Sequence, residues 1–371
     1  MKRWLRVAHR YIGITFAALW MLQAVTGALL VFHWELDDWA VAGPAAPLDA
    51  AALSVALGSY ASRYPGHTVS ALYASGGESG RFDVILDLPD GRNDILRVDG
   101  RGTVLRERPG NYDWLHIGPF QIATYLHQTL FAGTAGQWFL GASGVVLLLN
   151  LAFGLRLAWP RSGGWRRALW PPAAQTTPAR LWGLHRALGL WLVIPAMLVV
   201  ACGICLAFRA PIGKLIGVAE HDPPIALAEA IPQRISPVTA AEAIGQAMSR
   251  YPAGSLEAVI LPTARTPWYE VQVLQRGEAR RVEDLTTVHV SSHDGRVLAE
   301  YDERRAPLAN RMFDSLYALH TGGAGGIAMR WLAVMTGIWL TGMVGLGSML
   351  WSARRTARKR GSAATRPGIA T

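Results

Sequence analysis

Cysteine is nearly absent from this chain of 371 residues. The only two, Cys202 and Cys205, lie three residues apart inside one apolar run. Because no other segment contains a cysteine, a framework of disulfides is excluded for the rest of the chain. No histidine directly follows Cys205, so the pair lacks the pattern for covalent haem attachment. We expect two small core residues rather than a redox pair.

Charged residues are also scarce, at 17% of the chain, whereas 51% is hydrophobic and 15 residues are tryptophan. Four runs of 18 to 22 residues contain no charge: Ile12–Phe32, Trp138–Leu155, Ala187–Phe208 and Trp331–Trp351. A helix rises about 1.5 Å per residue and the hydrocarbon core is about 30 Å thick, so each run can cross a bilayer. Backbone groups in lipid must be paired within the segment, which favours helices. The sequence therefore predicts a bundle of four membrane-spanning helices.

Acidic residues are missing from three segments, 1–11, 156–186 and 352–371. These segments hold 16 of the 36 lysines and arginines and none of the 26 acids. The positive-inside rule places them, and both termini, in the cytoplasm. Membrane orientation thus accounts for the net charge of +10, and we expect the lipid bilayer, not nucleic acid, as the partner of these cations.

The two halves of the chain repeat each other. Residues 9–32 and 185–208 both begin with His-Arg, carry glycine four residues after the histidine and end in phenylalanine, at an offset of 176. Because its near copy lies in mid-chain, we interpret the first run as a span rather than a signal peptide. Residues 125–144 and 318–337 also match at an offset of 193, each with Leu-His, then tryptophan eleven residues later and glycine six after that.

Between the spans of each half, a helical pattern ends in Arg-Tyr-Pro and is followed by strand-like alternation. We therefore expect a duplicated unit of span, α+β domain and span, arranged as parallel repeats. The expected boundaries are a first span (1–34), a first periplasmic domain (35–124), a lead-in and second span (125–159), a cytoplasmic loop (160–183), a third span (184–209), a second periplasmic domain (210–316), a lead-in and fourth span (317–352) and a basic cytoplasmic tail (353–371).

Four of the ten histidines are related by the repeat, His9 with His185 and His127 with His320. The repeat predicts that each pair lies at one depth on opposite sides of the bundle. Two facing imidazoles can be the axial ligands of a haem iron, and helix bundles often hold cofactors in this way. A zinc ion lacks the further ligands for a tetrahedral site, and a proton relay lacks acids in the spans.

Glycines and arginines near these histidines suit a large anionic cofactor. Gly13 and Gly189, one turn after the first pair, would allow close approach of a flat ring, and Arg10, Arg186 and Arg330 could neutralise haem propionates. The repeat provides no histidine partner for two others, which we interpret as interface residues that could touch a haem edge or replace a ligand: His33 and His116. We expect the other four at the surface: His67, His221, His289 and His293.

The HRxxG openings of two spans, the stretch FHWELD at 32–37, the helices ending in RYP and the Leu-His before the closing spans resemble the PepSY-associated transmembrane family. The resemblance covers roughly residues 1–355. It implies PepSY-like periplasmic domains and a ferric-siderophore (ferrioxamine-type) reductase of the bacterial inner membrane with two haem b groups. It implies that His9 and His185 ligate the cytoplasmic-side haem, and that His127 and His320 ligate the periplasmic-side haem.

We therefore expect an oxidoreductase that moves electrons from the cytoplasmic side to the periplasm and reduces ferric siderophore. Iron would be released because hard oxygen ligands suit Fe(III) better than Fe(II). No GxGxxG fingerprint opens a helix after a strand, so a cytoplasmic reductase or a quinol should donate the electrons.

Two other functions remain open, a non-enzymatic PepSY-type binding or regulatory protein and a small transporter. A transporter should have broken spans and polar residues at mid-membrane. The only amides in the spans, Gln23 and Asn150, have no repeat partners, which disfavours transport.

Overall fold

A computed structural model of the chain describes residues 2–111, 113, 115–160, 163–170, 176–219, 237–280 and 285–364. The chain forms two compact units. The helical unit comprises Met1–Val31, Ala123–Arg209 and Leu319–Thr371, and the sheet unit comprises Phe32–Ile122 and Ala210–Ala318. Each unit is therefore built from both halves of the sequence.

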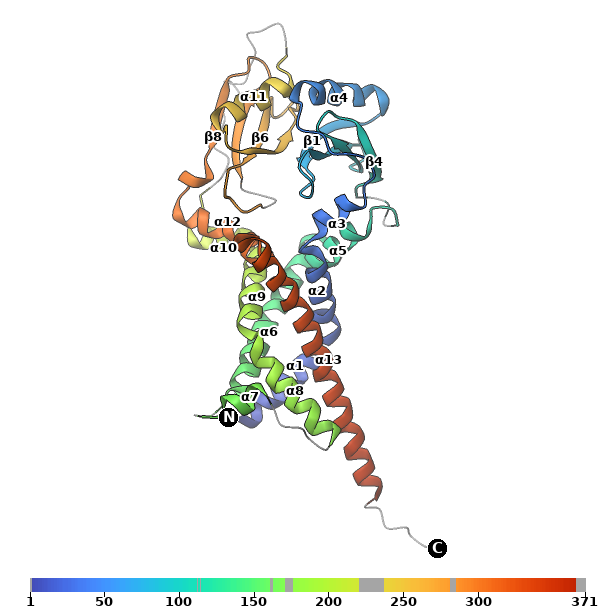
Figure 1. Cartoon of the computed structure of the whole chain (residues 1–371), viewed down its shortest axis with the longest axis vertical. Coiled ribbons are helices and arrows are strands. Elements are labelled where there is room, and N and C mark those ends of the chain that lie inside the picture. Colours follow the sequence, from blue (N-terminus) through green and yellow to red (C-terminus); the bar gives the residue numbers. More distant parts are fainter. Residues whose placement is uncertain are drawn as a thin grey trace. The chain divides into compact units, whose positions relative to one another are not determined.

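Two helices of the helical unit are long and apolar enough to cross a membrane alone, α6 (Gly133–Ala158) and α13 (Gly326–Ala364) (Figure 1). Two further crossings are formed only if a bent pair of helices counts as one span. These pairs are α1 (Lys2–Thr15) with α2 (Ala17–Leu30), and α8 (Thr177–Trp191) with α9 (Val193–Ala207). Within the described residues, between two and four segments are thus long and apolar enough to span a membrane.

The bends, of 66° and 64°, differ from the continuous helices that the apolar runs predicted. The first lies at Phe16 and the second at Leu192, positions that differ by the repeat offset of 176. Pro195 explains the second, because its ring clashes with the carbonyl four residues earlier, at Trp191. The first bend has no proline nearby. Neither α2 nor α9 exceeds 15 residues, or about 22 Å, so each needs its bent partner to cross the hydrocarbon.

Small residues set the close helix contacts of this unit. Helix α2 packs along α13 and α6 along α9, while α1 contacts α6 and α8 contacts α13. A Cβ at Gly141 of α6 would lie 2.6 Å from the ring of Phe208, and one at Gly337 of α13 would lie 2.8 Å from Ala28. Such stripes of small residues let membrane helices approach closely.

The short elements complete the description. They are α3 (His33–Trp39), α4 (Ala50–Arg63), α5 (Pro119–Gln128), α7 (Trp165–Leu169), α10 (Arg209–Ile216), α11 (Ala240–Arg250), α12 (Leu308–Thr321) and the 3₁₀ turns η2 (Glu303–Arg305) and η3 (Gly323–Gly325). Helix α13 continues past the predicted end of the fourth span into the basic segment, since residues up to Ala364 remain helical.

The sheet unit contains one antiparallel sheet of eight strands. The strands are β1 (Thr68–Ala74), β2 (Arg81–Asp87), β3 (Asn93–Asp99), β4 (Val104–Pro109), β5 (Ser255–Ile260), β6 (Trp268–Leu274), β7 (Thr286–Ser291) and β8 (Val297–Tyr301). Their order is β4-β3-β2-β1-β5-β6-β7-β8. The two halves meet at β1 and β5, where Leu72 pairs with Val259.

The sequence predicted two separate small domains, and here the structure differs. Helices α4 and α11 lie over one face of the common sheet (Figure 1), and side chains of both halves, such as Leu53 and Ile244, share one core. The physical reason is the edge strand. Had the halves stayed apart, β1 and β5 would each expose unpaired backbone groups, and pairing them removes both edges.

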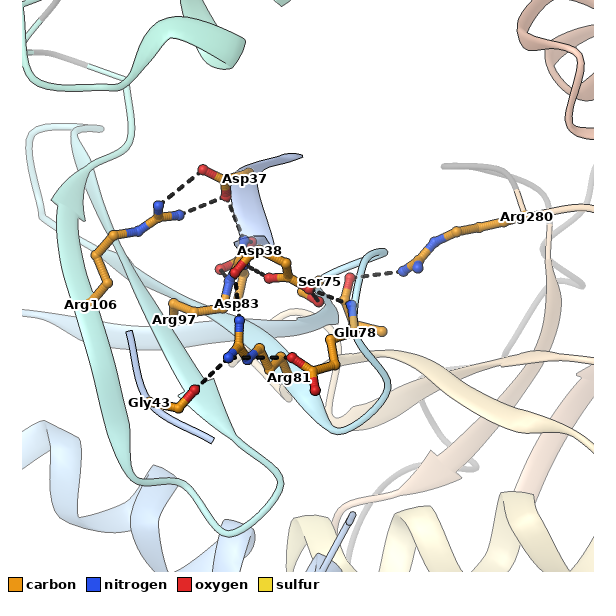
Figure 2. Close-up of polar contacts among 11 residues, drawn as sticks. Asp37, Asp38, Gly43, Ser75, Glu78, Arg81, Asp83, Arg97, Arg106 and Arg280 are labelled. Atoms are coloured by element: carbon orange, nitrogen blue, oxygen red, sulfur yellow. Dashed lines mark hydrogen bonds and ion pairs between the residues drawn. The ribbon is translucent and has the colours of Figure 1, made fainter. Parts of the chain in front are cut away.

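A buried charge cluster ties α3 to the first half of the sheet (Figure 2). Asp38, only 3% exposed, accepts hydrogen bonds from Ser75 Oγ at 2.7 Å and from the guanidinium of Arg97. Arg97 also pairs with Asp37, which in turn receives a bidentate contact from Arg106 at 2.6 and 3.0 Å. The acidic end of the FHWELD stretch and the residue after it therefore hold α3 in place.

Candidate functional site

The structure brings together the histidines that the repeat relates. His9 on α1 and His185 on α8, the first pair, have ring centroids 6.2 Å apart. His127 on α5 and His320 on α12, the second pair, have ring centroids 6.1 Å apart. All four lie in the helical unit. The predicted pairing of these side chains is thus found in the geometry, while their role as ligands stays a prediction.

The spacing suits a single metal ion between the rings of each pair. A bond from a metal to an imidazole nitrogen is about 2.0–2.1 Å, and the ring adds about 1 Å from that nitrogen to its centre. Two rings on opposite sides of one ion therefore have centroids about 6 Å apart. Both pairs have this separation.

Each of the four rings also rests on a glycine of another helix. A Cβ added to that glycine would approach the ring at Cε1. The distances are 3.0 Å for Gly154 to His9, 3.4 Å for Gly347 to His185, 2.8 Å for Gly27 to His127 and 3.0 Å for Gly203 to His320. Any larger residue at the three tightest positions would push the ring from its place.

In three of the four rings, Nδ1 has a hydrogen-bond partner that orients the ring. Nδ1 of His9 lies 3.0 Å from the carbonyl oxygen of Asn150, and Nδ1 of His320 lies 2.8 Å from that of Val199. Nδ1 of His127 lies 3.1 Å from Thr26 Oγ1, whose own proton goes to the carbonyl of Leu22. A proton on Nδ1 leaves the lone pair of Nε2 free for a metal, the arrangement usual in metal-bound histidine.

The ligand sets stop at two side chains. Among the described residues no three histidines, cysteines, aspartates or glutamates gather into a group that could hold a metal ion. A tetrahedral zinc site needs more protein ligands than either pair provides. Haem iron needs only two axial ligands, because the macrocycle supplies the other four. The donor sets therefore fit haem better than zinc.

The two pairs lie at different depths along α13. Gly347 contacts His185 of the first pair, whereas Gly337 packs on Ala28, the neighbour of Gly27, which contacts His127 of the second pair. Ten residues of helix correspond to about 15 Å, half of the hydrocarbon thickness of about 30 Å.

Two glycines named from the sequence lie elsewhere. A Cβ at Gly13 would meet the amide of Asn150 at 3.5 Å, and one at Gly189 would meet the methyl of Met343 at 3.2 Å. Both support helix packing one turn from the first pair. The glycines that face the rings were missed, although Gly27 and Gly203 differ by 176 and Gly154 and Gly347 by 193, the two repeat offsets.

The three arginines proposed as counter-charges already have protein contacts. The guanidinium of Arg10 lies 4.6 Å over the ring of Tyr11, and Nε of Arg186 donates to the carbonyl of Ala158 at 3.2 Å. Arg330 Nη2 donates to the carbonyl of Val31 at 2.5 Å. None of these contacts tests whether the three arginines neutralise haem propionates.

The secondary histidines belong to the sheet unit. His33 lies with its ring 4.7 Å from that of Trp34, and His116, with a side chain 70% exposed, bonds to Asp113 at 2.7 Å. Neither is among the paired rings.

The surface expectation for the remaining histidines is wrong for His289, which is 2% exposed because β7 is buried on both faces. His67 and His293 are half-buried, and His221 lies outside the described residues. Cys202 is a buried free thiol and Cys205 a half-buried one, as expected for packing residues.

Comparison with protein families assigns the chain as a whole. The family model described as the PepSY-associated TM region matches residues 6–354, which include all eight strands and the four paired histidines. Comparison with curated proteins gave no match. The matched segment is nearly the full length of the chain, and the protein therefore belongs to the family of the PepSY-associated TM region.

Proposed function

We propose that this membrane protein is a haem-carrying oxidoreductase of the bacterial inner membrane that moves electrons from the cytoplasm to the periplasm and reduces ferric siderophore. The observation that carries the proposal is the spacing of the two histidine pairs. In each pair the ring centroids lie at the distance expected when two imidazoles ligate one metal ion from opposite sides. A bundle that only anchors another domain has no need of two such pairs. Buried histidines in a membrane are costly and usually functional.

The residues of the chain have distinct tasks in this proposal. His9 and His185 would hold one haem b and His127 and His320 another. The glycines beneath the rings let the helices approach, and the Nδ1 partners fix the tautomer. When bound, haem supplies one-electron chemistry by cycling between Fe(III) and Fe(II).

The chain's charge supports the direction of transfer. The three segments rich in arginine and free of acids favour a cytoplasmic location for both termini and for the first pair. The sheet unit would then be periplasmic and present the surface that a ferric siderophore meets. Reduction favours release, because siderophore oxygens bind Fe(II) less well than Fe(III).

Gene duplication would account for the arrangement. The bends at Phe16 and Leu192 and the glycine contacts recur at the two offsets, and the strand order is mirrored on either side of β1 and β5. We infer that the four segments form four spans in parallel repeats, each half being span, α+β segment and span.

A reduced-minus-oxidised visible spectrum of the purified protein tests the proposal. We expect two b-type haems per chain. The double change His9→Ala/His185→Ala should remove one haem, and the double change His127→Ala/His320→Ala should remove the other. A colourless parent protein would refute the haem proposal and would leave the binding or regulatory module as the better reading. Haem that survives all four changes would show that other residues ligate it.

One observation favours the transporter alternative, namely the two bent pairs, since broken helices are common at transport sites. The bends have another explanation. Each lies seven residues after a histidine of the first pair, and the bent segments are those that bring His9 and His185 together. The amide of Gln23 is engaged as well, donating to the carbonyl of Leu126 at 3.0 Å. The electron donor, a cytoplasmic reductase or a quinol, can be distinguished by reducing the purified protein with each.

A further inference from the structure

The four histidines are not held equally. His9, His127 and His320 each have a hydrogen-bond partner at Nδ1, as described above. Nδ1 of His185 is buried and has no hydrogen-bond partner in the described part of the chain. The repeat makes this a matched comparison, because His185 is the counterpart of His9.

The packing beneath His185 is also the loosest of the four. The added Cβ at Gly347 would lie 3.4 Å from Cε1 and 3.9 Å from Nδ1 of His185, an ordinary contact. The corresponding approach at Gly154 to His9 is 3.0 Å and 3.5 Å. The ring of His185 is therefore packed less closely against its glycine than the ring of His9.

Both differences weaken a metal bond. A hydrogen bond to the outer nitrogen raises the basicity of the ligating nitrogen and fixes ring orientation. Loss of such a partner typically costs about 10–100-fold in metal affinity. A ring without close packing also loses the preorganisation that ligation requires.

We propose that His185 is the exchangeable ligand of the first pair, so that a small neutral ligand enters there in its place. This rests on the proposed haem function. The exchange breaks the bond between His185 Nε2 and Fe(II) and forms a bond from the iron to the incoming ligand. No electron is transferred, no proton moves, and His9 remains opposite. The second pair, with both Nδ1 atoms engaged, stays closed.

Carbon monoxide added to the dithionite-reduced, haem-loaded full chain tests this. We expect about half of the haem to bind carbon monoxide, all of it at the first pair. The double variant His127→Ala/His320→Ala should retain only the first haem and bind one carbon monoxide per haem. The variant His9→Ala/His185→Ala should retain only the second haem and bind none.

Single variants identify which histidine leaves. In His185→Ala no ligand has to leave, so carbon monoxide should bind faster, while its infrared stretching frequency should match that of the parent because His9 is still opposite. In His9→Ala the frequency should shift. Gly347→Ala fills the space beneath the ring of His185. This variant should bind carbon monoxide at its first haem more slowly than the parent does.

The outcomes separate this proposal from the one before it. A parent protein without haem refutes the oxidoreductase proposal. A parent with two haems that binds no carbon monoxide, or binds it at the second pair, overturns only the exchange proposal. If the carbon monoxide stretching frequency of His9→Ala, rather than that of His185→Ala, matched the parent's, His9 would be the ligand that leaves. If a double variant fails to assemble, the parent's stoichiometry and the Gly347→Ala rate still decide.

Discussion

Replacing Gly27 by alanine should empty the second pair selectively. The new Cβ would lie 2.8 Å from Cε1 of His127, whereas non-bonded carbon atoms prefer about 3.5–4.0 Å. The ring or α2 must therefore move by roughly 0.7–1.2 Å. Metal–ligand distances are held within about 0.2 Å, so a shift of this size is several times the tolerance. It also strains the 3.1 Å contact between His127 Nδ1 and Thr26.

The expected result is loss of one haem of two and a stability loss of about 1–3 kcal/mol, the usual cost of overpacking. Haem content per chain and the melting temperature measure both. The control is Gly345→Ala on α13, where an added Cβ meets nothing within 4 Å and alanine favours the helix by up to about 1 kcal/mol. A Gly27→Ala protein with both haems and an unchanged spectrum would show that the close contact is not needed for ligation.

Three predictions concern the sheet unit. Arg97→Met should destabilise it by about 3–5 kcal/mol, measured by urea or thermal unfolding, because it leaves buried aspartates without their cation; an unchanged melting temperature would contradict this. Burial would raise the pKa of Asp37, but the hydrogen bond and charge of Arg106 outweigh it and hold that pKa below its usual 3.8. The stability that the Asp37 carboxylate contributes is therefore present above about pH 4 and is lost as the pH falls through the lowered pKa. Asp37→Asn removes this titration, so the corresponding decrease in stability should be missing from its acid unfolding curve. Thr239→Ala removes the capping box with Glu242 at the start of α11 and should cost about 1 kcal/mol in the same unfolding assay. Thr239→Val tests whether the shape of the side chain, without its hydroxyl, is enough to stabilise the start of the helix.

Much of the local structure could be predicted from the sequence because it depends on period and composition. The uncharged run Trp138–Leu155 lies within α6, and the run Trp331–Trp351 lies within α13. The alternation at Trp268–Leu274 became β6 with Tyr269, Val271 and Val273 facing the core. Side chains that alternate on a strand or recur along a helix carry this information locally.

The bends and the shared sheet could not be predicted in the same way. An apolar run has the same composition whether its helix is straight or bent, and the proline at position 195 was the one available signal. The pairing of β1 with β5 joins strands about 190 residues apart, and neither strand's own sequence specifies its neighbour.

The candidate site could likewise be predicted only in part from the sequence. The repeat in the sequence identified four histidines and their partners, since duplicated segments that fold alike must place equivalent residues at equivalent positions. Only the packed helices show which glycine lies beneath each ring and which oxygen atom, if any, meets its Nδ1. These contacts join residues 100 or more positions apart, with no local pattern to encode them. The difference between His9 and His185, which the shared His-Arg-x-x-Gly opening does not reveal, therefore arises from what packs against them in three dimensions.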